Sequence, residues 1–478
     1  MINTKDIAAH RKSELSMLFN DKFTENGDTS FVSTGNKLID LLFRAEYYSK
    51  HLNEVRIGNS EVEKLFSMFV RDPRYGLKGK YRDYGRVLMR LSEVSPENVV
   101  LAGRYDDLWK RVIFEDFNDD WVNYLFEQCK AGNALAKKWM PHYTSKVNGR
   151  PSQSTVMAAK FRRVLGLTKQ QYNHLVKCDT VESKLSQHRN DEIDFSKIPS
   201  LALLKYWARF AGTSKKHPNT DMAERFSAYL ESVKKGESKM NFSTATVYDI
   251  YKNASKIDCD IAFNQIPKIS GNWLPILDTS ASMFDANDSF GKAMSIAHYL
   301  AKCSTYAPNQ IVSFSSRPQL IELGVTKPTI IRKYGLDTIP DNGSQYTREL
   351  RSMFTGDCSN TDFGAVMDIL SQLTTEFPDY LIVLSDMEFD DDSQRRNKYL
   401  LNHWKEKGIK TKMIWWNLNA RNVTTPDTVS FKEDENGNLF LSGYNPFLLQ
   451  YLEAGFNGEE FLAKLLNEYA KNIKLKID

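Results

Sequence analysis

A short polar segment in the second half of the chain offers several oxygen ligands within reach of one point. Asp278, Ser280 and Ser282 occupy alternate positions directly after the apolar run 272–277. Alternate side chains of an extended chain lie on the same side, so one carboxylate and two hydroxyls can face one ion. Oxygen ligands of this kind suit Mg²⁺ or Mn²⁺ and argue against zinc. The segment therefore predicts a divalent-cation site.

Two later segments supply further oxygen ligands. Thr361 lies in a polar loop before a helical stretch, and Asp386 follows the apolar run 380–384. If the apolar runs form a doubly wound parallel sheet, all three loops leave the same edge of that sheet. The alternative is that Ser282 and Thr361 cap the N-termini of helices, and the two roles can coexist. The expected metal ligands are Asp278, Ser280, Ser282, Thr361 and Asp386.

The apolar runs predict the strands that would carry these loops. The runs are short, most contain β-branched residues, and they alternate with helical stretches, a pattern typical of a mostly parallel sheet covered by helices on both faces. The expected strands are 272–277, 310–315, 380–385 and 411–416, and the expected helices between them are 290–303, 362–373 and 393–407.

The first half of the chain has a different pattern, in which helix follows helix. Apolar residues lie three and four apart, for example in Leu201–Phe210, Asp221–Val233 and Thr244–Lys252, and short polar breaks separate the helices. No exact repeat period is present, which is compatible with irregular stacked helix pairs. We expect a multidomain α + α/β protein, with a HEAT-like helical repeat region at 1–265 and a Rossmann-like α/β domain at 266–478.

Composition restricts the class of protein. The chain has 478 residues, of which 41% are hydrophobic and 26% charged, as in a globular protein of two or three domains. No apolar run reaches the roughly 18 residues of a membrane span, and the first residues lack the apolar core of a signal peptide. The five cysteines are far apart, so they predict neither a disulfide framework nor a zinc cluster. A cytoplasmic protein without a membrane partner is expected.

Charge is distributed unequally along the chain. Residues 1–270 contain 43 Lys and Arg against 33 Asp and Glu, a net charge of +10, and the remainder contains 21 against 27, a net charge of −6. A basic first half indicates an anionic partner for that half. The alternative is that these charges form an ordinary solvated helical surface.

Two basic stretches, 71–86 and 137–216, also contain aromatic residues. Cations beside aromatic rings suit single-stranded nucleic acid, because phosphates contact the charges and bases stack on the rings. The alternative places the tyrosines in the core and the charges in solvent. The candidate nucleic-acid-binding residues are Arg71, Arg74, Lys78, Lys80, Arg82, Lys160, Arg162, Arg163, Lys215 and Lys216.

The strand-end pattern resembles the metal-ion-dependent adhesion site (MIDAS) of von Willebrand factor A domains. The resemblance implies that Ser280, Ser282 and Thr361 contact the ion, and that Asp278 and Asp386 support it directly or through water. It also implies a coordination position that accepts an acidic side chain of a partner. Thr279 stands where small or apolar residues are common, and its side chain is expected to point away from the ion.

A helical half followed by such a domain resembles the Ro ribonucleoprotein family, the 60-kDa autoantigen with its TROVE module, and more closely a Ro-like family of viruses and bacteria. The resemblance implies a helical ring that binds single-stranded RNA ends and structured small RNA. The segments that carry it are Phe69–Gly79, Lys138–His142, Leu165–Tyr172, Ile193–Ser200, Ser385–Asp390, Trp415–Asn419 and Leu441–Pro446.

Two functions follow from these patterns. One is a non-enzymatic RNA-binding scaffold of Ro type, with single-stranded DNA as an alternative ligand. The other is an adaptor whose metal site recruits an acidic protein, such as an ATPase, chaperone, polymerase or replication factor. No catalytic residue is proposed, because no histidine is paired by sequence context with a Ser or Cys nucleophile.

Overall fold

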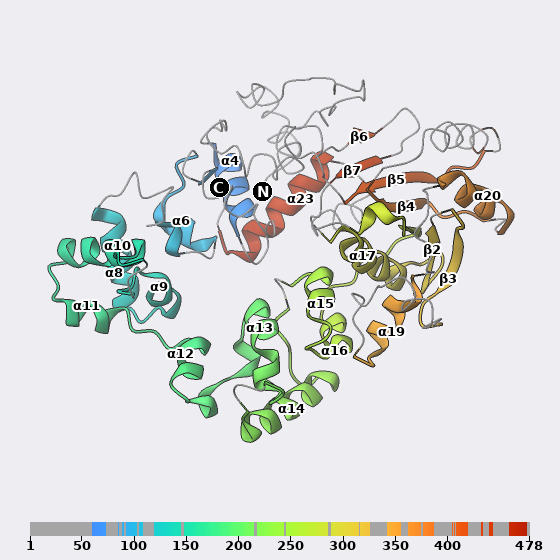
Figure 1. Cartoon of the computed structure of the whole chain (residues 1–478). Helices are drawn as coiled ribbons and strands as arrows, with labels where there is room; N and C mark the ends of the chain where they lie inside the picture. Colours follow the sequence, from blue (N-terminus) through green and yellow to red (C-terminus); the bar gives the residue numbers. More distant parts are fainter. Residues whose placement is uncertain are drawn as a thin grey trace. The chain divides into compact units, whose positions relative to one another are not determined.

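The computed structural model describes two compact units of the chain. The described residues are 60–72, 85, 88–89, 92–102, 105–108, 119–144, 148–214, 218–242, 245–284, 288–314, 316–325, 342–354, 362–373, 376–386, 404, 406, 408–418, 432–433, 439–442 and 458–475. Contacts group 60–194 with 458–475 in a first unit and 195–442 in a second. The first unit is helical, and the second contains the sheet (Figure 1).

The first unit joins segments from opposite ends of the described chain. Helix α4 (Glu61–Arg71) begins with a capping box, in which Ser60 and Glu63 bond reciprocally. Its apolar face packs against α23 (Gly458–Asn472), and the rings of Phe69 and Tyr469 meet edge to face at 5.5 Å. The hydroxyl of Tyr469 also donates to Asp72, at 3.2 Å. The C-terminal helix is therefore part of the helical unit.

The other described helices of the first unit are short and capped by polar side chains. The hydroxyls of Ser152 and Thr168, for example, accept backbone N–H groups in the first turns of α10 and α11. These helices are six to twelve residues long. Their lengths alone do not test the expected HEAT-like repeat, which stays a prediction. They are α6 (Pro96–Leu101), α8 (Asp119–Lys130), α9 (Ala134–Trp139), α10 (Gln153–Val164), α11 (Lys169–Leu175) and α12 (Val181–Ser186).

The second unit starts with helices α13 (Ser200–Phe210), α14 (Thr220–Lys234), α15 (Val247–Asn253) and α16 (Cys259–Asn264). Helices α13 and α14 confirm the helices expected at 201–210 and 221–233. Helix α15 overlaps the helix expected at 244–252 but begins later, after its N-cap Thr246. Helix α16 is bonded to a helix of the sheet region, because the carboxylate of Asp260 accepts the backbone N–H groups of Gln345 and Tyr346 at 3.1 and 2.8 Å. The compact units thus divide after residue 194, whereas the sequence pattern placed the domain boundary after residue 265.

In the described part of the chain, the sheet has seven strands in the order β3-β2-β1-β4-β5-β7-β6. The five inner strands are parallel, and the edge strands β3 and β6 are antiparallel to their neighbours. All four expected strands are present, and three further strands were not expected. The strands are β1 (Trp273–Asp278), β2 (Gln310–Phe314), β3 (Gln319–Glu322), β4 (Tyr380–Ser385), β5 (Lys412–Asn417), β6 (Lys432–Glu433) and β7 (Leu439–Ser442).

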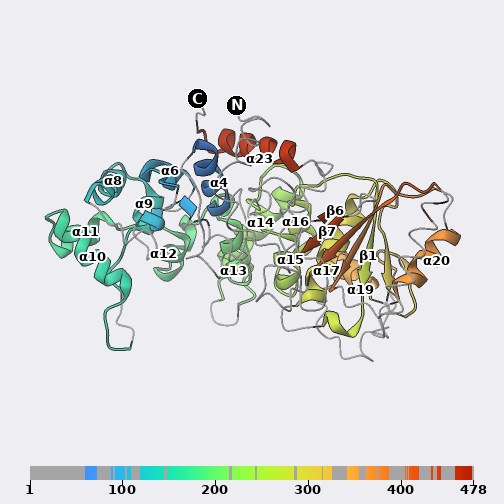
Figure 2. The same ribbon diagram turned by 90° about the horizontal axis from the view of Figure 1, so that it is seen from above.

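Helices cover both faces of this sheet, which lies between α17 (Ser289–Cys303) and α20 (Phe363–Leu373) in Figure 2. Ile276, Val383 and Met367 belong to the buried cluster on the α20 face. On the α17 side, the indole N–H of Trp273 donates to the carbonyl of Leu300 at 2.9 Å. Because the connections after β1 and before β4 use opposite faces, a crevice is expected between the carboxyl ends of these adjacent strands. Among the described residues, no helix is long and apolar enough to cross a membrane.

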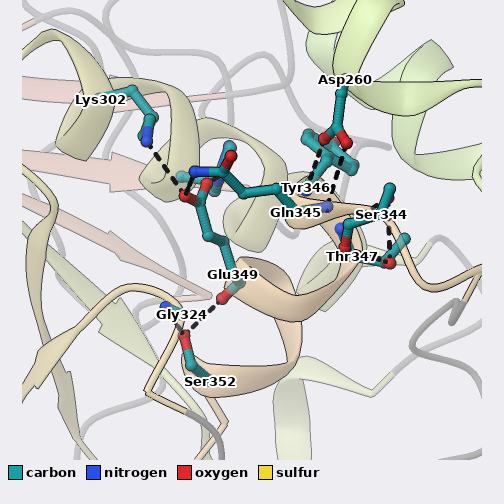
Figure 3. A network of polar contacts seen from close by, with 10 residues as sticks. Asp260, Lys302, Gly324, Ser344, Gln345, Tyr346, Thr347, Glu349 and Ser352 are labelled. Carbon is teal, nitrogen blue, oxygen red and sulfur yellow. Dashed lines mark hydrogen bonds and ion pairs between the residues drawn. The ribbon is translucent and has the colours of Figure 1, made fainter.

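A buried polar network connects α17 with α19 (Gln345–Ser352), as Figure 3 shows around Glu349. Nε2 of His298 lies 2.6 Å from Oε2 of Glu349, and Lys302 and Gln345 donate to the other oxygen at 3.1 and 2.8 Å. Burial acts to raise the pKa of Glu349, but the hydrogen bonds from His298, Gln345 and Lys302 outweigh it and hold the pKa at about 2. Glu349 is therefore ionised at neutral pH and joins the two helices.

Replacing Glu349 by glutamine should destabilise the protein by about 2–3 kcal/mol at pH 7, because the ionised carboxylate that accepts from His298, Lys302 and Gln345 is lost. A carboxyl group with a lowered pKa stabilises the fold fully above its usual pKa and loses this effect as pH falls toward its folded pKa. The difference between wild type and variant should accordingly shrink between pH 5 and pH 3 in urea unfolding, since the pKa falls from 4.5 to about 2. Glu322→Gln, at an exposed position of β3, serves as the control. A difference independent of pH would contradict the role given to the charge.

Candidate metal centre and basic surface

The carboxyl ends of β1 and β4 are joined through Asp278. This residue ends β1 and is fully buried. Its Oδ2 accepts the hydroxyl of Ser385, the last residue of β4, at 2.5 Å. Its Oδ1 accepts the backbone N–H of Ser280 at 2.8 Å. The expected ligands Asp278 and Ser280 thus lie together in the crevice that the strand order predicts.

The hydroxyls of Ser280 and Ser282 lie 3.1 Å apart, so alternate positions do aim these groups at one place. The alternative function of Ser282 as an N-cap is wrong, because the N-cap of α17 is Asp288, whose carboxylate accepts the N–H of Gly291. Thr361, the other candidate cap and ligand, lies outside the described residues. The paired serines therefore lie beside Asp278, where the predicted cation ligands are expected.

A second carboxylate lies close to the first. Asp386 follows β4 directly and is 5% exposed. Burial first, and then the charge of Asp386, raise the pKa of Asp278 to about 6, although the hydrogen bonds from Ser385 and Ser280 act to lower it. No Lys, Arg or His of the described chain forms an ion pair with Asp278. Two neighbouring buried carboxylates of this kind are stabilised by a cation.

The donor set fits a hard divalent cation. It combines the carboxylates of Asp278 and Asp386 with the hydroxyls of Ser280 and Ser282, all of them oxygen ligands. This set has only two carboxylates, and the described ranges contain no cluster of three or more His, Cys, Asp or Glu residues placed to hold a metal ion. An ion in this crevice would therefore keep water or take ligands from a partner, as Mg²⁺ commonly does.

Ser385 is a functional candidate that sequence reasoning missed. It directly precedes Asp386, which was singled out, and a hydroxyl at a strand end beside a candidate ligand is the signal that would have found it. Thr279 lies where expected, since its N–H and hydroxyl both donate to the carbonyl of Phe314 on β2, at 2.9 and 3.1 Å. Its side chain therefore belongs to the sheet.

Arg71 corrects one expectation about the nucleic-acid surface. The residue ends α4 and is only 2% exposed. Its guanidinium binds the buried carboxylate of Asp107 through two nitrogens, with 2.7 Å between Nη2 and Oδ1. Since phosphate cannot reach this group, Arg71 is part of the core of the helical unit.

The remaining candidates divide between helix α10 and residues outside the described ranges. Lys160 and Arg163 are exposed on α10. Arg162 is half-buried, and its Nη1 donates to the carbonyl of Leu167 at 3.0 Å, just beyond the helix. Arg162 therefore helps to end α10 and is a weaker candidate. The candidates outside the described residues are Arg74, Lys78, Lys80, Arg82, Lys215 and Lys216.

The second basic stretch overlaps a segment without any acidic residue. From 128 to 178 the sequence has ten Lys or Arg and no Asp or Glu. Tyr172 and Phe161 in this segment are buried, and Tyr143 packs edge-on against Tyr172 with Lys169 over its ring at 4.8 Å. Two of these rings are therefore part of the core and the third lies beside a cation, so the surface of this segment is mainly cationic. The exposed cations are Lys130, Arg150, Lys160, Arg163, Lys169 and Lys177.

Comparison with known proteins gives similarities of three kinds. A family model described as a domain of unknown function (DUF7788) matches residues 272–474. An uncharacterised protein, L728 of Acanthamoeba polyphaga mimivirus, is 22% identical, with 95% of this chain and 88% of the relative covered. The crystal structure of the RO (RSR) protein of Deinococcus radiodurans matches with 12% identity and a TM-score of 0.39, covering 95% of this chain and all of that one. The family model thus spans the whole sheet and all the described candidate cation ligands.

Proposed function

We propose that this chain is a non-enzymatic scaffold that binds RNA through its helical first unit. The observation that carries the proposal is the acid-free segment 128–178, with its exposed Lys and Arg residues. Such a surface attracts phosphate groups of any base sequence, and binding releases counterions, so the affinity falls steeply as salt rises. The Ro-like segments of the sequence are the reason for testing RNA before DNA.

The first test is whether the purified protein carries nucleic acid. The ultraviolet absorbance ratio is measured before and after treatment with RNase, and separately with DNase. Material sensitive to RNase supports the RNA scaffold, and sequencing it names the ligand. A clean protein that also ignores added RNA at low salt contradicts the proposal.

Replacing both Lys160 and Arg163 by glutamate should weaken RNA binding for all sequences, because it removes two exposed cations from α10. The slope of log affinity against log salt should fall by roughly two. Filter binding at four salt concentrations measures both quantities. The matched control is Lys464→Glu with Lys471→Glu, two exposed positions of α23 in the same unit. An equal loss in the control would show an effect of net charge alone and would remove α10 from the RNA surface.

A second function, the metal-dependent capture of an acidic protein, is supported by the buried pair Asp278 and Asp386. A divalent cation there would have coordination positions that the described ligands do not fill, and a carboxylate of a partner can fill one. Calorimetric titration with Mg²⁺ and with Mn²⁺ tests the cation site. A synthetic peptide rich in Asp should then bind in the presence of the cation and not after its removal with EDTA. Binding of the peptide without a cation would point to simple charge attraction instead.

A further inference from the structure

The start of α17, the helix that follows the cation-site loop, is held by a helix from outside the sheet. Its N-cap, Asp288, has a φ of +56°, a left-handed conformation that Asp tolerates better than most residues. Its Oδ1 accepts the N–H of Gly291 at 3.2 Å, and its Oδ2 accepts the hydroxyl of Tyr248 on α15 at 2.8 Å. Tyr248 therefore fixes a residue on which the beginning of α17 depends.

Gly291 allows this close approach of α15. A Cβ atom at this position would lie 2.5 Å from the ring of Tyr251 and 2.5 Å from Oδ1 of Asp288. The rings of Tyr248 and Tyr251 lie nearly parallel, with centroids 6.1 Å apart and 15° between their planes. Two tyrosines of α15 thus contact the first turn of α17, which explains why this turn contains a glycine.

The same turn is connected to the cation site by hydrogen bonds. The hydroxyl of Ser289, the first residue of α17, donates to the carbonyl of Leu418 at 3.4 Å. The N–H of Leu418 donates to the carbonyl of Ser385 at 2.9 Å, and the hydroxyl of Ser385 donates to Asp278. A continuous series of contacts therefore runs from Tyr248 to the buried carboxylate of the site.

We infer that Tyr248 is a positioning residue for the cation site and that α15 controls the affinity of the site, an inference that rests on the cation site proposed above. The ion needs the hydroxyls of the loop between β1 and α17 in one place. When Tyr248 holds the far end of that loop, less conformational freedom is lost on binding. By reciprocity, a bound cation stabilises the docking of α15, and a partner that moves α15 changes the affinity for the ion.

The test removes one hydroxyl, in Tyr248→Phe, and measures binding of Mg²⁺ alone and of Mn²⁺ alone to the full chain by calorimetry. The affinity should fall by about five- to tenfold, a typical coupling between two linked sites. Tyr229→Phe is the matched control, because its hydroxyl donates to the carbonyl of Lys239 at 3.1 Å, a hydrogen bond that is not part of the series between Tyr248 and Asp278. This control should bind both cations as wild type does.

A second variant and a second readout separate positioning from general stability. Asp288→Asn keeps a residue that tolerates the left-handed conformation, and its amide can cap the helix and donate to Tyr248, so its affinity should stay within about threefold of wild type. Hydrogen exchange of the amides in α15 should slow when the cation is added to wild type, and should not respond in Tyr248→Phe.

The outcomes distinguish the inference from the site on which it rests. If wild type binds neither cation, the cation site is wrong and the inference fails with it. If wild type binds and Tyr248→Phe binds equally well with the same exchange response in α15, the inference alone fails. Weaker binding in Tyr248→Phe with an unchanged control and a lost exchange response supports it.

Discussion

Replacing Asp278 by asparagine is expected to remove divalent-cation binding while leaving the protein folded. The side chain is fully buried, ends β1 and accepts hydrogen bonds from Ser385 and Ser280. Asparagine has the same size and can still accept one of these bonds through its amide oxygen. It lacks the negative charge that would attract the ion, so the affinity should fall on the order of 100-fold.

Thermal unfolding shows this loss without any assay of activity. A cation that binds the folded state alone stabilises it, by about 2.7 kcal/mol at a concentration 100 times its dissociation constant. Wild type should therefore unfold at a higher temperature in Mg²⁺ or Mn²⁺, and Asp278→Asn should show no such increase. Without a cation the variant should be at least as stable as wild type, because an ionised buried carboxylate has been replaced by a neutral group.

Asp379→Asn is the matched control for this experiment. Asp379 is exposed just before β4, at the opposite end of the strand from Ser385. The control should keep the full response to the cation. If Asp278→Asn unfolds the protein, the polar cluster is structural, and if the response to the cation persists, the ligands of the ion lie elsewhere.

The buried strands were predictable from the sequence because each has a continuous apolar run. β1, β2, β4 and β5 coincide with predicted runs to within about one residue, as expected for strands covered on both faces. The edge strand β3 was missed since three of its four residues are exposed, which leaves no apolar run. Edge strands are defined by their pairing partner, and the partner is invisible in a local pattern.

The division into units could not be predicted from local patterns. Helix α23 follows the sheet in sequence, yet Tyr469 packs on Phe69, about 400 positions away. Helix α16 precedes the sheet and bonds to α19 through Asp260. Both assignments depend on long-range contacts, whereas periodicity reports only that a helix forms and which of its sides is apolar.

The candidate site was predictable as far as strand ends define it. Asp278, Ser280 and Asp386 lie at or just after the carboxyl ends of β1 and β4, which meet at the switch point of the sheet, so their proximity follows from topology. The basic stretches were less predictable. Charge alone does not distinguish an exposed Arg163 from a buried Arg71, because burial depends on whether a carboxylate from another segment reaches the guanidinium.

Replacing Arg71 by methionine should destabilise the helical unit strongly and should not act primarily on RNA binding. The guanidinium is bonded to Asp107, which is fully buried, and loss of the arginine would leave that carboxylate without its cation. Removing one partner of a buried ion pair costs about 3–5 kcal/mol. Urea unfolding at pH 7 measures this loss, and Arg163→Met, at an exposed position, should change the stability by less than about 0.5 kcal/mol.

A double variant distinguishes the buried pair from other effects of the mutation. Arg71→Met combined with Asp107→Leu removes both charges, and apolar replacement of both partners is often close to neutral, so about 2 kcal/mol or more should be regained. Neither variant changes Tyr469 or Asp72, so the hydrogen bond between them can still hold α23 against the end of α4. If Arg71→Met is as stable as wild type and binds RNA more weakly, Arg71 acts on the ligand. If it unfolds more easily and the double variant recovers, the first basic stretch begins with a core residue, and the search for RNA contacts moves to α10 and its neighbours.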